Sequence, residues 1–379
     1  MKYPLFKVHV DVESAVEEIR KVLASGYINE GEKVEEFRSE LCNFFETKNV
    51  VLTNSCTSSL TMALKASGVS NDDEVITTAM TCVATNMPVI QLGAVPIWAD
   101  IDRNTGNISP DHVRRLISEK TKAIMCVNWA GLPCDMDELS RICKENNLKL
   151  ILDAAHSLGA RYNGKDVSNF ADFTCYSFQA IKHITTGDGG AIIVKSSKDL
   201  SKVKKLKWFG MDRDETKNSK GDWKGQRWEF DIDSIGYKFN MNNFAAALGL
   251  SQVSHIERIL SSHRKNAEVY ERRFRNLDAI QSLRYPKDSI PSFWVYTCLL
   301  DKDVNRDSVL EALNDEGIQA GLVHIPNHRY TCFKDSEKDL PETEYFHSHQ
   351  ISLPCGWWLK EEDVEHIASR VASLCKEKK

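Results

Sequence analysis

The 379-residue sequence lacks several features that mark common classes of protein. Its longest apolar runs have the length of a β-strand, which is too short to cross a membrane. No basic tail or stripe accompanies the net charge of −5 (49 basic and 54 acidic residues), so nucleic-acid binding is not the expected activity. The first residues form a mixed polar segment and not a signal peptide. We therefore expect a cytoplasmic protein.

Motifs for metals, disulfides and nucleotide phosphates are also missing. The eleven cysteines are scattered without a CxxC pair, which favours reduced thiols over a disulfide framework or a zinc site. His324 and His328 are an improbable metal pair, because Pro326 lies between them and disfavours a helix. The segment Gly187–Gly190 lacks the spacing of a P-loop and the helix that follows one. We expect no bound metal.

Short apolar runs alternate with segments of helical periodicity in the first half of the chain. The expected strands are Val50–Thr53, Glu74–Thr78, Val95–Ala99, Ala123–Asn128, Leu148–Asp153, Phe173–Phe178 and Ala191–Val194. The expected helices are Asp11–Ala24, Glu32–Phe45, Ser58–Ala66, Ala84–Leu92, Pro110–Ile117 and Met136–Glu145. Apolar strands separated by helices are typical of a sheet covered on both faces. We predict an α/β fold with a mixed, mostly parallel seven-stranded sheet.

The last third of the chain has a different order of elements. Residues 242–277 have a helical pattern, as one helix or two. The elements expected after it are strands at Trp294–Leu300 and Gln319–His324 and helices at Arg306–Asn314 and Lys360–Cys375. Because 379 residues exceed what one core usually holds, we predict a large domain over 1–250 and a smaller C-terminal α/β domain over 251–379. Residues 208–231 form a long loop, either a lid or an exposed insertion.

A lysine and an aspartate occupy strand ends in this pattern. Lys182 follows the strand Phe173–Phe178 and precedes a glycine-rich turn, where backbone can pack closely around a ligand. Asp153 ends another strand, and ligands of parallel sheets collect at such ends. Pyridoxal phosphate requires an amine for its aldehyde and a carboxylate for its pyridine nitrogen. Asp153 could instead cap a following helix, and this alternative stays open.

The segment Asn54–Ser59 offers groups that bind a phosphate. It connects an expected strand to an expected helix, and helix N-terminal N–H groups with short hydroxyls form an anion site. Ser177 would add a hydroxyl from another strand end. Because the same residue types cap helices, this signal is weak by itself.

Three motifs in order resemble the DegT/DnrJ/EryC1/StrS family of pyridoxal-phosphate sugar aminotransferases, which have the aspartate-aminotransferase fold. They are Cys56–Leu60, Asp153–Ala160 and Ser177–Gly190. Further agreement extends to Gly26–Gly31, Gly93–Pro96, Asp100–Asp102, Gly236–Tyr237, Ala246–Gly249 and Ser352–Pro354. The resemblance implies a homodimer with shared active sites. It also implies transfer of the amino group of L-glutamate to a nucleotide-linked keto-sugar, by a ping-pong mechanism through pyridoxamine phosphate.

The resemblance also implies roles for single residues. Lys182 would be the catalytic amine, and Asp153 would pair with the pyridine nitrogen. The cofactor-binding residues that the resemblance implies are Cys56, Thr57, Cys82, Asp153, His156, Ser177, Lys182, Lys238 and Asn240. The substrate contacts that we expect are Tyr27, Arg213 and His328, although a solvent-facing loop is an equal alternative for His328.

Three positions depart from the family pattern. Cys82 stands where many members have an aromatic residue against the cofactor ring, so ring stacking would come from elsewhere, such as His156. Lys238 stands where many members have an asparagine that reaches the partner subunit's phosphate, and a lysine would serve as a point charge. Cys56 replaces the usual glycine of the phosphate loop.

The residue at position 182 separates transamination from a related reaction. Some relatives are dehydratases with a histidine at this position, and histidine cannot form the Schiff base. The resemblance therefore implies an aminotransferase for a keto-sugar such as a 3- or 4-keto-6-deoxy hexose, in the biosynthesis of a surface glycan (a polysaccharide or lipopolysaccharide) or of a secondary metabolite. The alternatives are a dehydratase that uses the same cofactor and a non-catalytic sensor that binds it.

Overall fold

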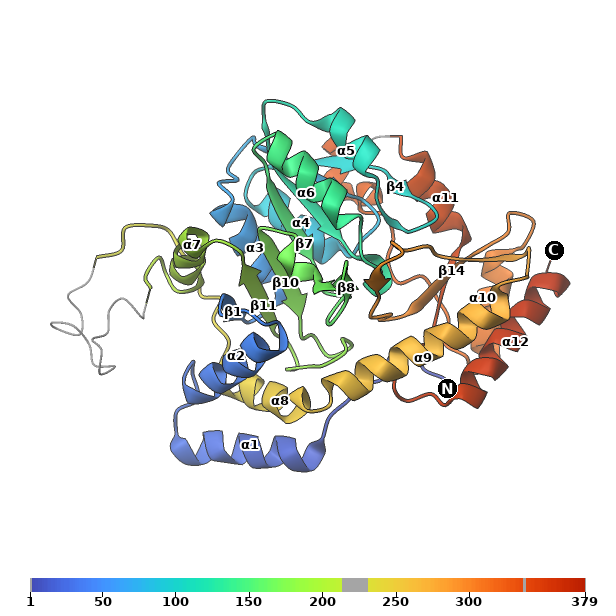
Figure 1. Cartoon of the computed structure of the whole chain (residues 1–379), viewed down its shortest axis with the longest axis horizontal. Helices are drawn as coiled ribbons and strands as arrows, with labels where there is room; N and C mark the ends of the chain where they lie inside the picture. Colours follow the sequence, from blue (N-terminus) through green and yellow to red (C-terminus); the bar gives the residue numbers. More distant parts are fainter. Residues whose placement is uncertain (1, 213–230, 337–338, 379) are drawn as a thin grey trace.

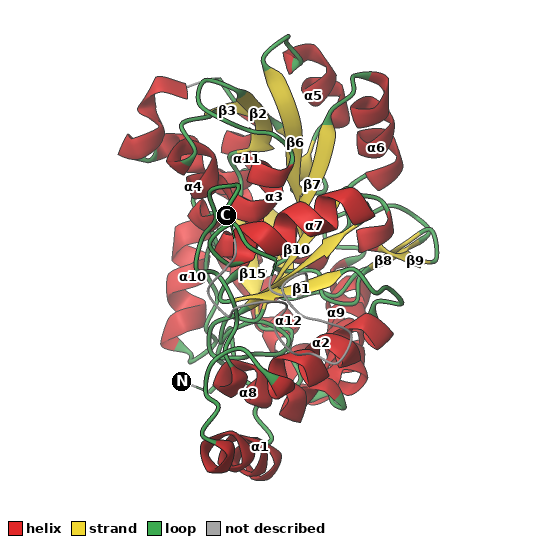
Figure 2. Cartoon of the chain, turned by 90° about the vertical axis from the view of Figure 1, so that its left-hand side faces the viewer, coloured by secondary structure: helices red, strands yellow, loops and turns green. Residues whose placement is uncertain are grey.

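A seven-stranded sheet forms the centre of the larger part of the molecule in the computed structural model, which describes residues 2–212, 231–336 and 339–378 (Figures 1 and 2). In spatial order its strands are β1 (Val50–Thr53), β11 (Gly190–Val194), β10 (Phe173–Ser177), β7 (Lys149–Asp153), β6 (Thr121–Val127), β2 (Glu74–Thr78) and β3 (Val95–Ala99). The strands from β10 to β3 run parallel, whereas β11 runs antiparallel to both of its neighbours. The predicted mixed, mostly parallel sheet is confirmed.

Helices cover both faces of this sheet (Figure 2). The helices of this part are α1 (Val12–Ser25), α2 (Glu32–Phe44), α3 (Cys56–Ala66), α4 (Val83–Gln91), α5 (Pro110–Leu116), α6 (Met136–Glu145), α7 (Ser197–Lys207) and α8 (Asn243–Val253). Successive strand residues point to opposite faces. Leu150 and Leu152 of β7 therefore join the core with α2, α5, α6 and α8, while Ile151 joins the core with α3, α4 and α7.

The C-terminal part has its own antiparallel sheet and core. Its strands are β12 (Ile280–Ser282), β14 (Tyr296–Leu300) and β15 (Gln350–Leu353). Its helices are α9 (Ile256–Phe274), α10 (Arg306–Asp315), α11 (Pro341–His349) and α12 (Glu361–Glu377). Tyr3 and Leu5 from the start of the chain are buried in this second core. The domain boundary at residue 250 stays a prediction, and α8 and α9 show that residues 242–277 form two helices.

One predicted strand is wrong. Residues 319–324 form no strand, because the backbone pairs with β15 only through Gly321 and Ser352. After this single bridge the chain leaves the sheet edge toward Asn327. The sequence pattern also did not predict α7, α11, β12 or β15. The remaining short strands are β4 (Ile101–Asp102), β5 (Asn107–Ile108), β8 (Arg161–Tyr162), β9 (Lys165–Asp166) and β13 (Ser289–Ile290), and the 3₁₀ turns are Trp129–Gly131, Val167–Asn169, Asn327–Arg329 and Thr331–Ser336.

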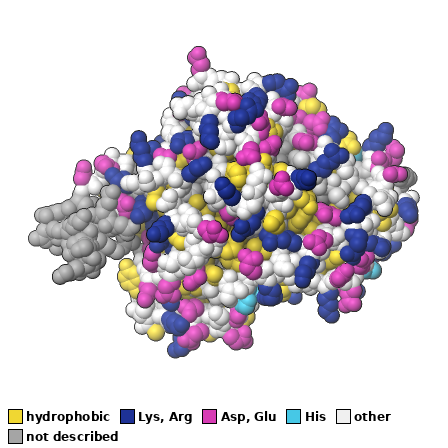
Figure 3. Space-filling view, in the orientation of Figure 1, with side chains coloured by type: hydrophobic (Ala, Val, Ile, Leu, Met, Phe, Trp, Pro, Cys, Tyr) yellow, Lys and Arg dark blue, Asp and Glu magenta, His cyan; other side chains and the backbone are white. Residues whose placement is uncertain are grey.

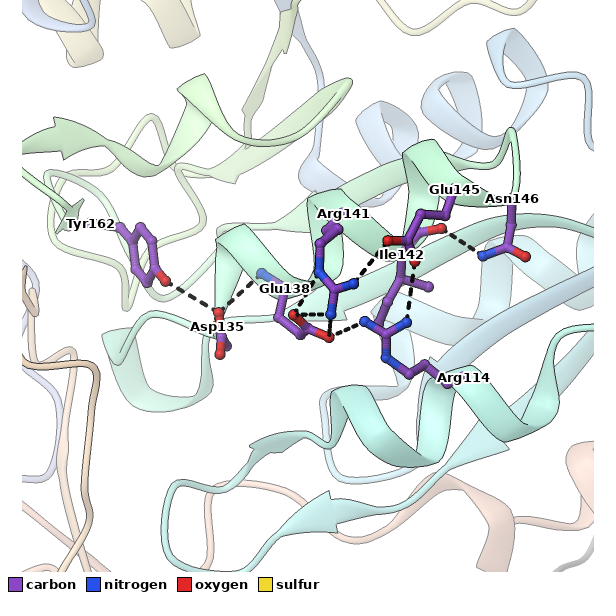
Figure 4. Close-up of polar contacts among 8 residues, drawn as sticks. All are labelled: Arg114, Asp135, Glu138, Arg141, Ile142, Glu145, Asn146 and Tyr162. Atoms are coloured by element: carbon purple, nitrogen blue, oxygen red, sulfur yellow. Dashed lines mark hydrogen bonds and ion pairs between the residues drawn. The ribbon is translucent and has the colours of Figure 1, made fainter.

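Charged side chains cover much of the surface. Figure 3 shows basic and acidic groups mixed over the face in view. Some form ion pairs: Arg114 of α5 pairs with Glu138 and Glu145 of α6, and Arg141, which also belongs to α6, pairs with the same two carboxylates (Figure 4). Exposed pairs of this kind contribute little to stability. None of the described helices is both long and apolar enough to span a membrane.

Candidate active site

The register of the central sheet brings three chain segments together at one sheet edge. Gly190 pairs with Thr53 on one side and with Ser177 on the other. Because β11 runs antiparallel, its first residue meets the last residues of β1 and β10. Asp153 ends the next strand, where it pairs with Cys175. The strand-end residues that the sequence singled out therefore lie along a single edge.

Asp153 is a buried carboxylate held by neutral donors. Its Oδ2 atom accepts a hydrogen bond of 2.7 Å from the Thr85 hydroxyl, and its Oδ1 atom accepts one of 3.0 Å from the Ala155 N–H. The Cys56 thiol lies 3.9 Å from Oδ1. Burial raises the pKa of Asp153, although these donors and the charge of Lys182 oppose the rise. No helix follows Asp153, so the helix-cap alternative is wrong.

Lys182 lies close enough to Asp153 for the charge of each group to affect the pKa of the other. Burial lowers the pKa of Lys182 to about 8, against the opposing effects of Asp153, Cys82 and Cys56. The Nζ atom lies 3.6 Å from the centre of the Trp294 ring. Among the described residues, no carboxylate lies within ion-pair distance of Nζ. A lysine with this pKa has a sizeable fraction of reactive neutral amine near neutral pH.

His156 and His324 form a stacked pair beside Lys182. The two rings are 5.3 Å apart and nearly parallel, with the Nε2 atoms 3.4 Å from each other. The His156 ring also stacks on Trp294 at 4.0 Å. Burial and the charge of Lys182 hold the pKa of His156 well below its usual value, and burial lowers the pKa of His324 to about 3. Both imidazoles are therefore neutral at physiological pH.

The predicted phosphate loop begins helix α3. Ser55 caps this helix, because its hydroxyl accepts a hydrogen bond of 3.1 Å from the Ser58 N–H. Cys56 and Thr57 are the first two helical residues, with Cys56 buried and Thr57 partly exposed. An added Cβ at Gly190 would lie 2.6 Å from the Cys56 backbone nitrogen, so only glycine permits this close approach. The loop has the backbone N–H groups of an anion site.

Residues 238–240 lie beside this loop in the same chain. Asn240 bridges to Thr53, and the Asn54 N–H donates a hydrogen bond of 2.8 Å to the carbonyl of Phe239. The Nζ atom of Lys238 lies 4.0 Å above the Trp208 ring and 3.2 Å from Asn240 Oδ1. The predicted contact of Lys238 with the partner subunit's phosphate stays a prediction.

The remaining candidates are placed as follows. Cys82 is the residue before α4 and acts electrostatically on Lys182, so it lies near that lysine. Tyr27 is half exposed and lines a separate cavity of about 890 Å³ between α2 and α7. The Nε2 atom of His328 lies 3.0 Å from Glu344 of α11. Arg213 lies outside the described residues, as does most of the 208–231 loop.

Sequence reasoning missed three residues that surround this site. Trp294 was assigned only to a strand, and His324 was considered only as the end of another strand and as an improbable metal ligand. Thr85, which binds Asp153, was not considered at all. Each of them is brought to the site by tertiary structure from a segment without a local motif, and an aromatic residue just before a strand was the only available signal for Trp294.

The arrangement fits pyridoxal phosphate. A buried carboxylate that has no cationic partner among the described residues can receive a protonated pyridine nitrogen, and a lysine of lowered pKa can react with an aldehyde. The buried Nδ1 atom of His156 has no hydrogen-bond partner in the part of the chain that the structure describes, and it is available to a polar group of a ligand. The fold and the site are those of a pyridoxal-phosphate-dependent α/β enzyme.

Comparison with known proteins gives the family. Residues 10–372 match the model of the DegT/DnrJ/EryC1/StrS aminotransferase family. The UDP-4-amino-4,6-dideoxy-N-acetyl-beta-L-altrosamine transaminase of Helicobacter pylori is 32% identical over 359 residues, which cover 93% of this chain and 92% of that protein. The spore coat polysaccharide biosynthesis protein SpsC of Bacillus subtilis is 31% identical over 373 residues, which cover 95% of this chain and 94% of SpsC.

A solved structure agrees with this relationship. The PLP-form of Spr1654 from Streptococcus pneumoniae superposes with a TM-score of 0.89 at 26% identity, and the match covers 100% of this chain and 99% of that chain. The chain therefore belongs to the DegT/DnrJ/EryC1/StrS aminotransferase family. It is an aminotransferase, and its cofactor is pyridoxal phosphate.

Proposed function

We propose that this aminotransferase moves the amino group of L-glutamate onto a nucleotide-linked keto-sugar, a 3- or 4-keto-6-deoxy hexose. The observation that carries the proposal is the proximity of the Lys182 amine and the Asp153 carboxylate in the protein interior, near the N-terminus of α3. The name of the Helicobacter pylori relative supports a nucleotide-linked sugar as the acceptor. The lysine at position 182 favours amino transfer over the dehydratase and sensor alternatives.

Asp153 holds the proton of the cofactor's ring nitrogen in this proposal. The bound cofactor supplies an electron sink for the substrate carbon and carries the amino group between the two half-reactions of a ping-pong cycle. Thr85 and the Ala155 N–H fix both carboxylate oxygens, so the side chain is oriented before any ligand enters. Burial strengthens the attraction between the carboxylate and a protonated ring nitrogen, because little water screens it.

Lys182 moves the proton of the substrate carbon. Its Nζ atom, once free, is a base near neutral pH because burial lowers its pKa to about 8. After it takes the proton, the Lys182 ammonium becomes the acid that returns a proton to another atom of the bound substrate and cofactor. The neutral His156 beside it can donate or accept one hydrogen bond without adding a charge to the cavity.

In this proposal the phosphate loop, Asn54–Ser59 at the start of α3, binds the cofactor phosphate. The N–H groups of Cys56 and Thr57 are at the helix N-terminus, where the helix dipole favours an anion. Ser177 adds a hydroxyl from the end of β10. The further parts of the proposal are a homodimer with shared active sites, a cytoplasmic location and a role in polysaccharide biosynthesis, which the name of SpsC supports.

An isotope experiment tests the proposed reaction. The protein is incubated with pyridoxal phosphate, nitrogen-15 L-glutamate and a panel of nucleotide-linked 3- and 4-keto-6-deoxy hexoses, and the products are analysed by mass spectrometry. We expect one sugar nucleotide to gain the heavy nitrogen while 2-oxoglutarate appears. The Lys182→Ala variant serves as the control and should transfer none.

Two other outcomes would contradict the proposal. A sugar that loses water without gaining nitrogen would indicate a dehydratase. Cofactor binding without 2-oxoglutarate release from L-glutamate would indicate the sensor.

A further inference from the structure

The ε-amine of Lys182 lies over the ring of Trp294. The Nζ atom lies 3.6 Å from the ring centre, and the indole N–H donates a hydrogen bond of 2.8 Å to the carbonyl of Ile181, the residue before the lysine. The same ring stacks on His156 at 4.0 Å and on Phe6 at 4.8 Å. Trp294 thus contacts both the reactive lysine and the histidine beside it.

The backbone around Trp294 is fixed by bonds to the segments that carry these two residues. The Trp294 N–H donates to the carbonyl of Ala130 at 2.9 Å, and the Ser292 hydroxyl donates to the carbonyl of His156 at 3.0 Å. The ring nitrogen Nε2 of His183 lies 3.1 Å from the carbonyl of Ser292. Trp294 and Ser292 are therefore tied to the loops beside the site.

Two residues of the segments that bond to each other around Trp294 have unfavourable backbone angles. Phe293 has a φ of 47° and Ala130 a φ of 54°, which non-glycine residues seldom adopt. Such strain persists only where the surrounding structure imposes it, and it clusters at functional sites. The strained residue immediately precedes Trp294, so the strain is associated with the placement of the indole.

We infer that Trp294 is a positioning residue that holds the ε-ammonium of Lys182 whenever this amine is not bonded to the cofactor. The inference rests on the proposed function, because it assigns Trp294 a task between the two half-reactions. An indole face attracts a cation by its quadrupole, most strongly where water is excluded. The indole keeps the amine beside His156 and out of ion-pair distance of Asp153, which stays available to the ring nitrogen.

The inference predicts a measurable change in the titration of Lys182. Because the indole favours the charged amine, its removal should lower the pKa of Lys182. The probe is acetic anhydride, which acetylates the neutral amine, and mass spectrometry measures the acetylation of each lysine as a function of pH. The full-length protein is used without cofactor and again loaded with pyridoxamine phosphate, two states in which the amine is free.

Two substitutions separate the ring from its hydrogen bond. Trp294→Leu removes the aromatic face, and we expect the labelling midpoint of Lys182 to fall by roughly half a unit to one unit. Trp294→Phe keeps a face but loses the indole N–H, and the fall should be smaller. Phe6→Leu is the matched control, because it removes a neighbouring ring and leaves the indole, and its midpoint should equal that of the wild type.

The protein also contains internal references. Lys7 lies over Trp357 and Lys238 over Trp208, and the midpoints of these lysines should not move in the Trp294 variants. Where Trp294→Leu does not fold, fluorinated tryptophans replace it, because added fluorine weakens the quadrupole without changing the shape. The midpoint of Lys182 should then fall stepwise with the number of fluorines.

The results separate this inference from the proposed function. An unchanged or raised midpoint in Trp294→Leu would overturn the role of Trp294, as would equal falls in Trp294→Leu and Trp294→Phe. An unchanged midpoint across the fluorinated series would overturn it as well. Failure of the wild type to gain visible absorbance with pyridoxal phosphate would overturn the proposed function instead, because the acetylation profile needs no reaction with the cofactor.

Discussion

At the scale of single residues, burial determines the chemistry of this site. The same lack of water lowers the pKa of Lys182, raises that of Asp153 and keeps His156 neutral. The lysine amine becomes more reactive, and the buried carboxylate is stabilised when it binds a cation. These opposite shifts of an amine and an acid in one cavity are characteristic of an active site and uncommon for residues that only stabilise a fold.

The reaction of Lys182 with pyridoxal phosphate should depend on pH with a midpoint near 8. Below this pH the amine is protonated and unreactive, and above it the neutral amine predominates, so the rate should rise through about pH 8 and then level off. Stopped-flow measurement of the visible absorbance after mixing gives this rate. A midpoint near 10.5, the ordinary lysine value, would show that the amine is not desolvated.

Replacing the carboxylate of Asp153 should impair catalysis more than folding. In Asp153→Asn the amide keeps the shape but cannot balance a protonated ring nitrogen, so we expect kcat to fall at least about a hundredfold. The matched control is Asp166→Asn, since desolvation also raises the pKa of the Asp166 carboxyl, which accepts hydrogen bonds from Ser168 and Tyr176. Equal losses of kcat in the two variants would contradict the role of Asp153.

At the scale of secondary-structure elements, one reversed strand organises the site. Because β11 runs antiparallel between β1 and β10, Gly190 lies against the start of α3. A parallel strand at this position would place its C-terminal end there. The phosphate loop and the end of β10 thus lie at the same edge of the sheet, because both are next to Gly190.

Adding one carbon at Gly190 should displace the phosphate loop. In Gly190→Ala the new Cβ would lie 2.6 Å from the Cys56 nitrogen and also close to Ser55, both backbone atoms that cannot rotate away. We expect the affinity for pyridoxal phosphate to fall about tenfold or more, as measured by titration of the visible absorbance. Gly321→Ala is the control, because no atom lies within 4 Å of its added carbon. An unchanged affinity in Gly190→Ala would show that this approach does not shape the loop.

At the scale of the whole molecule, the C-terminal third completes the site of the large sheet. It supplies Trp294 and His324, and Asn327 attaches it firmly. The Asn327 side chain donates a hydrogen bond of 2.8 Å to the carbonyl of Thr81 and accepts one of 2.9 Å from Asn86. Thr81 immediately precedes Cys82, so this contact anchors the segment 324–328 beside the cavity.

Loss of this attachment should destabilise the protein. Asn327→Ala removes the donor to the buried carbonyl of Thr81 and the acceptor of one Asn86 N–H, while the Asn86 nitrogen keeps its bond to the Thr78 carbonyl. A buried polar group that loses its partner costs about 1–3 kcal/mol. Denaturation in urea measures the change, and Asn276→Ala is the control because Asn276 is exposed. A variant as stable as the wild type would contradict the attachment.

The sequence predicted the large sheet well and the C-terminal third in part, since β14, α10 and α12 were found but β12, β15 and α11 were not. All seven strands were found because strands covered on both faces are continuously apolar, as Leu150–Leu152 shows. Lys182 and Asp153 could be paired because parallel strands end at one edge. Trp294 and Thr85 reach the site only through tertiary structure, and residues 319–324 have the composition of a strand but make a single bridge.

The role of Lys182 is tested most directly by finding the lysine that bonds to pyridoxal phosphate. The protein is mixed with pyridoxal phosphate and reduced with borohydride, and the peptides are analysed by mass spectrometry. We expect a phosphopyridoxyl group on Lys182, and none in the Lys182→Ala variant. A stoichiometric adduct on another lysine, or no adduct at all, would contradict it.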